Sequence, residues 1–141
     1  MQEETSSLPF SSTSSSNVSS GSKRILLVDD EPDVTTTLKM GLEGTGYKVD
    51  AFNDPAEALS KFKVGVYDLL LLDIKMPKMN GFQLYEELEK LDRNAKVCFI
   101  TAFEVYYRSL RELFPQIEID CFIKKPIDTE ELVKRIQAEL Q

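Results

Sequence analysis

The stretch Leu69–Gly81, LLLLDIKMPKMNG, decides the fold of this chain. It begins with a run of leucines that Asp73 ends. A short apolar run without alternation is typical of a strand buried on both faces, as in a parallel sheet. Met76-Pro77 and Asn80-Gly81 then indicate a loop and a turn. Asp73 is therefore expected at the carboxyl end of a buried strand, where open α/β sheets place their chemistry. Taken alone, it is also typical of a turn or helix N-cap aspartate.

The rest of the chain alternates strand and helix patterns. Strands are expected at Ile25–Val28, Tyr47–Phe52, Asp68–Asp73, Lys96–Thr101 and Asp120–Lys124. Helices are expected to begin near Pro32, Pro55, Gly81, Glu104 and Asp128, the fourth spanning Glu104–Phe114 and the last starting with an Asp128/Glu131 capping box. Such alternation with short loops implies parallel βαβ units with helices on both faces of one sheet.

The first 22 residues differ in composition from the rest, because ten of them are serines and few are sizeable and apolar. Such a segment cannot bury enough surface to offset the entropy of ordering it. We expect a disordered tail over residues 1–22 and one folded domain over residues 23–141. No further domain is expected after Leu140, so the chain is either a stand-alone domain or a fragment of a longer protein.

Composition excludes several classes of function. The formal net charge is −7 and the pI is near 4.7, which argues against non-specific binding to nucleic acid or to an anionic membrane surface. Histidine-based acid–base catalysis is excluded because the chain has no histidine. No apolar stretch approaches ~20 residues and no secretory signal opens the chain. We expect a soluble, cytoplasmic protein with reduced thiols.

Two cysteines lie in apolar runs, Cys98 in VCFI and Cys121 in DCFI. Buried free thiols are the expected state. The absence of paired spacing and of histidine argues against a disulfide or a zinc site.

In a parallel sheet, all carboxyl ends meet at one edge. The residues expected there are Asp29, Asp30, Asp73, Thr101, Lys124 and Lys125. Carboxylates packed together repel one another unless a divalent cation or a lysine lies among them. Oxygen donors without histidine favour Mg²⁺ over zinc. Asp73 would then be a carboxylate nucleophile able to form an aspartyl-phosphate.

The stretches ILLVDDEP, LLLLDIKMPKMNG, ITA and FIKKPI together resemble the receiver domain of a two-component response regulator, of the CheY-like superfamily. The resemblance covers Lys23 to Leu140. It implies a doubly wound, flavodoxin-like sheet with strand order 2-1-3-4-5 and five helices. It also implies a phosphorylatable signalling switch rather than an enzyme with a separate substrate.

The resemblance further implies roles for individual residues. Asp73 would be the phosphoacceptor. Asp29 and Asp30 would be the acidic pair for Mg²⁺, with Asp30 the more direct ligand. The backbone carbonyl of Lys75 would be a third protein ligand beside Asp73.

The resemblance also assigns residues around the phosphoryl group. Lys125, before a Lys125-Pro126 bond that is cis in many receivers, would be the motif lysine, with Lys124 as the alternative. Thr101 would be the switch hydroxyl and Phe122 the switch aromatic. Lys75 and Phe103 would tune the phosphoryl lifetime, and the bulk of Phe103 predicts slow self-hydrolysis.

The implied partners are a sensor histidine kinase or phosphotransfer protein and a downstream target. The target would bind a face made by the fourth helix, the fifth strand and the fifth helix. Tyr106, Tyr107 and the atypical turn at Pro115 either cover the sheet or form a partner or homodimer surface. No direct contact with nucleic acid or membrane is expected.

Three other interpretations are weaker. A flavodoxin-like electron carrier needs a phosphate cradle after the first strand, where this chain has the acidic loop Asp29–Pro32. An aspartate-nucleophile phosphatase needs an acid where Lys75 stands. A degenerate receiver would bind a protein without phosphorylation, although every motif residue is present here.

Overall fold

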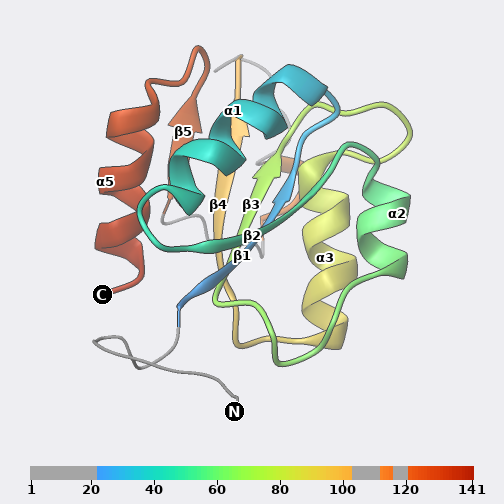
Figure 1. The fold of residues 1–141 in the computed structure, drawn as a ribbon. Helices are drawn as coiled ribbons and strands as arrows, with labels where there is room; N and C mark the ends of the chain where they lie inside the picture. Colours follow the sequence, from blue (N-terminus) through green and yellow to red (C-terminus); the bar gives the residue numbers. More distant parts are fainter. Residues whose placement is uncertain (1–21, 103–111, 116–120) are drawn as a thin grey trace.

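The computed structural model describes residues 22–102, 112–115 and 121–141. They form one parallel sheet with strand order β2-β1-β3-β4-β5, flanked by helices on both faces (Figure 1). The strands are β1 (Arg24–Val28), β2 (Lys48–Phe52), β3 (Leu69–Asp73), β4 (Lys96–Thr101) and β5 (Phe122–Lys124). The helices are α1 (Pro32–Glu43), α2 (Pro55–Ser60), α3 (Gly81–Leu91) and α5 (Thr129–Glu139). The predicted doubly wound fold and its strand order are therefore confirmed.

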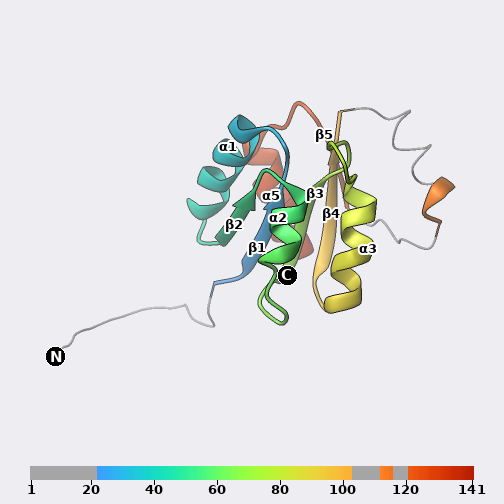
Figure 2. The ribbon, with the colours of Figure 1, turned by 90° about the vertical axis from the view of Figure 1, so that its right-hand side faces the viewer.

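The central strand β3 is buried along its whole length. Its leucines alternate between two apolar clusters because successive side chains point to opposite faces of a strand. Leu70 and Leu72 belong to the cluster under α2 and α3, and Leu69 and Leu71 to the cluster under α1 and α5. Figure 2 shows these two helical layers on either side of the sheet. Asp73 is the first polar side chain after this apolar run.

The element boundaries differ from the predictions at a few points. β5 begins at Phe122, two residues later than expected. At the start of α5, the Asp128 side chain accepts a hydrogen bond from the backbone N–H of Glu130. A reciprocal capping box occurs instead at the start of α3, between Asn80 and Gln83. The predicted tail and most of the predicted fourth helix lie outside the described residues.

The loop after β3 returns closely to the strand that it leaves. The backbone N–H of Gly81 donates to the carbonyl oxygen of Ile74, at 2.8 Å. A Cβ atom on residue 81 would overlap the carbonyl oxygen of Asp73. A glycine is required here by this close approach, since it alone has no Cβ.

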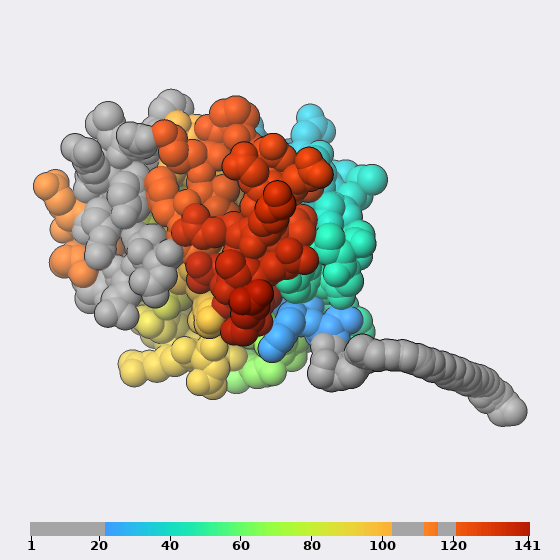
Figure 3. Space-filling model, turned by 90° about the vertical axis from the view of Figure 1, so that its left-hand side faces the viewer, coloured from blue at the N-terminus to red at the C-terminus, as the bar shows by residue number. Residues whose placement is uncertain are grey.

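Helix α5 packs beside α1, and in Figure 3 the red atoms of the C-terminal part of the chain lie next to the cyan atoms of α1. The contact is tight at Gly41, where a Cβ atom would overlap the methyl group of Thr129. The helices in the described ranges are all too short or too polar to span a bilayer.

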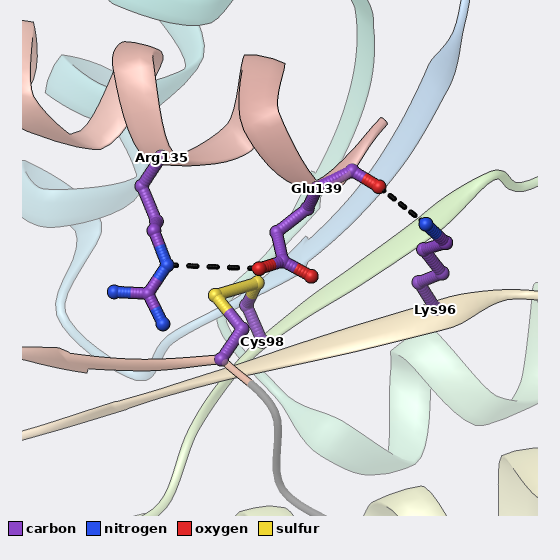
Figure 4. Close-up of a disulfide and its surroundings, with 5 residues drawn as sticks. Lys96, Cys98, Arg135 and Glu139 are labelled. Atoms are coloured by element: carbon purple, nitrogen blue, oxygen red, sulfur yellow. Dashed lines mark hydrogen bonds and ion pairs between the residues drawn. A yellow bond between two sulfur atoms is a disulfide. The ribbon is translucent and has the colours of Figure 1, made fainter. Parts of the chain in front are cut away.

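The prediction of two free thiols is wrong. Cys98 and Cys121 form a disulfide, with their Cα atoms 4.5 Å apart, and both residues are fully buried (Figure 4). The reason is the register of two neighbouring parallel strands. Phe99 pairs with Phe122, so the residues that precede each of them lie side by side. The spacing of the two cysteines in the sequence therefore did not indicate that they are neighbours in the sheet.

Candidate functional site

Three carboxylates gather where β1 and β3 end. The two strands are neighbours, and Val28 pairs with Leu72, so the residues after each lie at the same edge. Carboxylate oxygens of Asp29, Asp30 and Asp73 all lie within 4.8 Å of one another. Asp29 and Asp73 are 0% and 3% exposed. Such proximity of buried acids is costly unless positive charge is close.

Lys125 brings positive charge to this cluster from the loop after β5. Its Nζ atom lies 2.9 Å from Oδ2 of Asp29 and 3.5 Å from Oδ2 of Asp73. The side chain is only 16% exposed. The Lys125–Pro126 peptide bond is cis. Lys124, the sequence alternative, is exposed beside α5 and lines a different surface hollow with residues of that helix.

The two carboxylate oxygens of Asp29 differ in their hydrogen bonding. Its Oδ1 accepts a hydrogen bond from the backbone N–H of Glu31, at 2.9 Å. Its Oδ2 atom is buried and contacts the Lys125 ammonium as an ion pair, yet accepts no well-aligned hydrogen bond from the described residues. One buried lone-pair direction is thus available to a further cation.

Burial dominates the ionisation of the acids. It raises the pKa of Asp73 to about 7, with a further increase from the charge of Asp29 and a partial decrease from Lys125. Burial also raises the pKa of Asp29, partly offset by Lys125. For Lys125, burial acts to lower the pKa, but the carboxylates of Glu31, Asp29 and Asp73 outweigh it and raise the pKa. The lysine therefore stays charged, and Asp73 is the acid whose ionisation most depends on added positive charge.

The other predicted residues surround this cluster at different depths. Thr101 ends β4 and is 0% exposed; its neighbour in that strand, Ile100, pairs with Asp73. Phe122 is half-buried at the start of β5, against the cluster under α2 and α3. Lys75 is exposed in the loop after β3. Phe103 lies outside the described residues.

A surface hollow opens over the carboxylates. It is lined by Asp30, Glu31, Asp73, Lys75, Met76, Pro77, Ala102 and Lys125. A small ligand can therefore reach the buried Asp73 carboxylate from solvent. Apolar and charged groups share the wall of this hollow.

Sequence analysis did not assign Glu31 or Asn53 to the site. Oε1 of Glu31 lies 2.8 Å from the Lys125 ammonium, and the third acid of the run Asp-Asp-Glu was an available signal. The amide of Asn53 donates to the carbonyl oxygen of Asp29 and to the hydroxyl of Thr35, each at 2.9 Å. No sequence pattern indicated this link, which connects the end of β2 to α1.

The donor set fits a hard divalent cation. The acidic cluster offers oxygen ligands from two strand ends, and Asp29 has a buried oxygen that is only partly satisfied. Oxygen donors of this kind suit Mg²⁺. A second group of metal-ligand types, Cys98, Cys121 and Glu139, has both sulfur atoms committed to the disulfide.

Comparison with protein families gives one clear match. The sequence model of the response regulator receiver domain matches residues 25–137. Among curated proteins, the chain is 33% identical over 119 residues to the transcriptional regulatory protein PcoR of Escherichia coli, covering 84% of this chain and 52% of PcoR. It is 36% identical over 119 residues to the transcriptional regulatory protein TrcR of Mycobacterium tuberculosis, covering 84% of this chain and 45% of TrcR.

Solved structures with the same fold include several that are over 30% identical. A CheY-like receiver domain protein of Methanospirillum hungatei is 32% identical, with a TM-score of 0.74, covering 85% of this chain and 94% of that one. The response regulator TrrA of Thermotoga maritima, solved in complex with Mg²⁺ and BeF, is 36% identical, with a TM-score of 0.69, covering 82% of this chain and 97% of that one.

The chain spans about half the length of the curated relatives that it matches. Those relatives are named as transcriptional regulators. Their names bear on the expectation of no direct contact with nucleic acid, because they indicate DNA-directed functions in those relatives. The net charge of −7 argues against non-specific binding of nucleic acid by this domain itself, but it carries no information about a protein domain joined or bound to it.

Proposed function

The chain belongs to the family of response regulator receiver domains, and from that premise we propose that it is a switch that accepts a phosphoryl group on Asp73. The observation that carries the proposal is the placement of Asp73: a nearly buried carboxylate at the end of the central strand, open to a surface hollow and close to a charged lysine. A carboxylate so placed is a suitable nucleophile for phosphoryl transfer.

The transfer is a simple substitution at phosphorus. An Asp73 carboxylate oxygen forms the new P–O bond while the bond to the donor's histidine nitrogen or acyl oxygen breaks. The leaving group keeps the electron pair of that bond, and a leaving histidine nitrogen takes up a proton. These 141 residues contain no histidine, so a histidine donor would lie outside them, and the proposed donor is a histidine kinase or phosphotransfer protein.

The surrounding residues supply charge and position. Asp29, Asp30, Asp73 and the backbone carbonyl of Lys75 are the proposed Mg²⁺ ligands. Bound there, Mg²⁺ would neutralise charge on the phosphoryl oxygens and keep Asp73 ionised. Lys125 provides a second positive group beside Asp29 and Asp73. The Thr101 hydroxyl is the proposed hydrogen-bond donor to a phosphoryl oxygen.

The output is a change in packing at the β4–β5 edge. The phosphoryl group adds about −1.5 to −2 charge units, by analogy with other phosphorylated side chains. We expect Thr101 to move toward it and Phe122 to turn inward, which shifts the population between two packings of one fold. Phe103 remains the proposed shield against hydrolysis. The names of the relatives support a DNA-binding domain as the target, joined to this domain or bound to it.

The test is incubation with acetyl phosphate and Mg²⁺, followed by intact-protein mass spectrometry. Wild type is expected to gain the mass of one phosphoryl group, and Asp73→Asn none. Asp54→Asn is the matched control, because Asp54 is an exposed helix N-cap that also ends in a carboxylate. Absence of the added mass on wild type would favour the degenerate, purely protein-binding receiver.

A further inference from the structure

The Cys98–Cys121 disulfide joins two strands that otherwise pair over a short distance. Among the described residues, Phe99 to Thr101 of β4 pair with β5, three residues against three. The carbonyl oxygen of Cys121 accepts a hydrogen bond from the backbone N–H of Phe99, at 3.0 Å. The disulfide therefore lies at the first rung of this pairing and constrains where β5 starts.

Whatever fixes β5 also fixes the lysine of the site. β5 lies at one edge of the sheet and is partly exposed. Lys125 follows it directly, and its backbone N–H donates to the carbonyl oxygen of Thr101, at 2.8 Å. The short segment from Cys121 to Lys125 thus has the disulfide at one end and, at the other, the ammonium that lies among the carboxylates. Loss of the bond would give the whole segment more freedom.

The two sulfur atoms are covered by the last turn of α5 (Figure 4). A carboxylate oxygen of Glu139 and both sulfur atoms lie within 4.8 Å of one another. This turn is held by Lys96, whose ammonium donates to the Glu139 carbonyl oxygen at 2.6 Å, and by a 3.6 Å ion pair between Arg135 and Glu139. Helix ends open locally at low cost in free energy. Opening of this turn would let a small thiol reagent reach the buried disulfide without global unfolding.

We propose that Cys98 and Cys121 are a thiol–disulfide redox site that controls the phosphoacceptor site through β5. This inference rests on the proposed function for its effect on Asp73. The reductant is a dithiol: its two sulfur atoms lose two electrons and two protons and become a disulfide, while the Cys98–Cys121 bond breaks and two thiols form. A disulfide of small-molecule class reverses the reaction.

The reduced state suits the same packing. Two neutral thiols are small and apolar enough for the core that now holds the disulfide. The carboxylate of Glu139 beside them disfavours a thiolate, since like charges repel. Reduction should therefore leave the domain folded and change mainly the freedom of β5 and Lys125.

The first test asks whether Cys98 and Cys121 can be reduced to thiols and oxidised again to the disulfide. Wild type is treated with dithiothreitol or with oxidised glutathione and alkylated under denaturing conditions, and its mass is measured by intact-protein mass spectrometry. Two alkylated cysteines are expected after the dithiol and none after the disulfide. Two alkylated cysteines under both conditions would overturn the proposal.

The second test measures β5 directly, by hydrogen–deuterium exchange of peptides that contain Ile123 and Lys125. Exchange is expected to be several-fold faster in the reduced protein. The exchange of the Cys98→Ala/Cys121→Ala variant should match that of the reduced wild type and should not change when the dithiol is added. Peptides from β1 should exchange at the same rate in the oxidised and the reduced protein. Equal exchange in both redox states would overturn the proposal, and wild type alone decides this if the double variant does not fold.

The third test measures the rate of phosphoryl gain from acetyl phosphate and Mg²⁺. The reduced protein is expected to react several-fold more slowly, because Lys125 is less well placed. If β5 exchange responds but neither state gains a phosphoryl group, the proposed function is wrong while the redox site stands. If both states react at one rate, the control of Asp73 by the disulfide is wrong while the proposed function stands.

Discussion

The Lys125 ammonium donates a hydrogen bond to Oε1 of Glu31, with 2.8 Å between the nitrogen and the oxygen. The same nitrogen lies farther, 3.5 Å, from Oδ2 of Asp73. Glu31 is also the N-cap residue of α1, but its side chain makes no capping hydrogen bond. Its carboxylate thus contacts the lysine of the site instead of its own helix, and competes with Asp73 for the ammonium.

Glu31→Gln is expected to speed the phosphorylation of Asp73 several-fold, because the charge that competes for Lys125 is removed. Stability should change little, since the Glu31 side chain is 60% exposed and exposed ion pairs contribute about 0–1 kcal/mol. The measurement is the rate of phosphoryl gain from acetyl phosphate. Asp33→Asn removes the same charge from the exposed first turn of α1 and should leave the rate unchanged. Equal rates for wild type and Glu31→Gln would contradict the competition.

Gly81→Ala is expected to destabilise the domain by about 1–3 kcal/mol, the usual cost of overpacking. The added methyl group would overlap the carbonyl oxygen of Asp73, which is backbone and cannot turn away. Urea denaturation measures the loss. Gly44→Ala is the control, because φ of Gly44 is −62° and its nearest contact for a Cβ is 3.3 Å. A neutral Gly81→Ala would show that the loop after β3 has room to move.

Asp73→Asn is expected to stabilise the metal-free protein more at pH 8 than at pH 5. Burial and the Asp29 charge raise the pKa of Asp73 from 3.8 to about 7. Between these values the native protein holds a proton that the unfolded chain releases, so wild-type stability falls as pH rises. Asparagine removes this dependence, so its stabilisation over wild type should be larger at pH 8 than at pH 5 by roughly 2–3 kcal/mol.

Urea denaturation in EDTA at both pH values measures this gain. Adding Mg²⁺ at pH 8 should then stabilise wild type more than Asp73→Asn, because the variant lacks one proposed ligand. A gain that is the same at pH 5 and pH 8 would mean that Asp73 ionises in the native protein as easily as in the unfolded chain.

Reduction of the disulfide is expected to lower the free energy of unfolding by about 3 kcal/mol. The two cysteines are 23 residues apart in the sequence, and a closed loop of this length restricts the unfolded chain by that amount. Thermal unfolding with and without a dithiol measures the effect. The double alanine variant should unfold alike in both conditions. Identical wild-type transitions would show that the bond does not constrain the unfolded chain.

The sequence predicted most of the sheet because β1, β3 and most of β4 are apolar runs with a clear end. The leucines of β3, followed at once by Asp73, and the run before Asp29 identified both halves of the acidic edge. Lys125 was predicted through the resemblance and lies within 3.5 Å of Asp73. The position of these residues at one edge follows from where each strand ends, which is a local property of the chain; the roles assigned to them stay predictions.

Contacts between separate elements were harder to predict. The link from Asn53 to Asp29 depends on how β2 and α1 approach one another, which no single segment encodes. The disulfide had a signal that was not used: both cysteines are followed by Phe-Ile. If the fourth and fifth strands are neighbours, aligning these repeats pairs Phe99 with Phe122 and places Cys98 beside Cys121. The relation becomes visible only when the strand order is combined with the register.

The alternating leucines of β3 have a consequence for the accuracy of the site. A slip of the strand by one residue would exchange the leucines of the two clusters and turn the Asp73 side chain to the other face of the sheet. A slip by two would restore the faces but displace the carboxylate by roughly 7 Å. The packing of unreactive leucine side chains therefore determines the position of the Asp73 carboxylate along the strand.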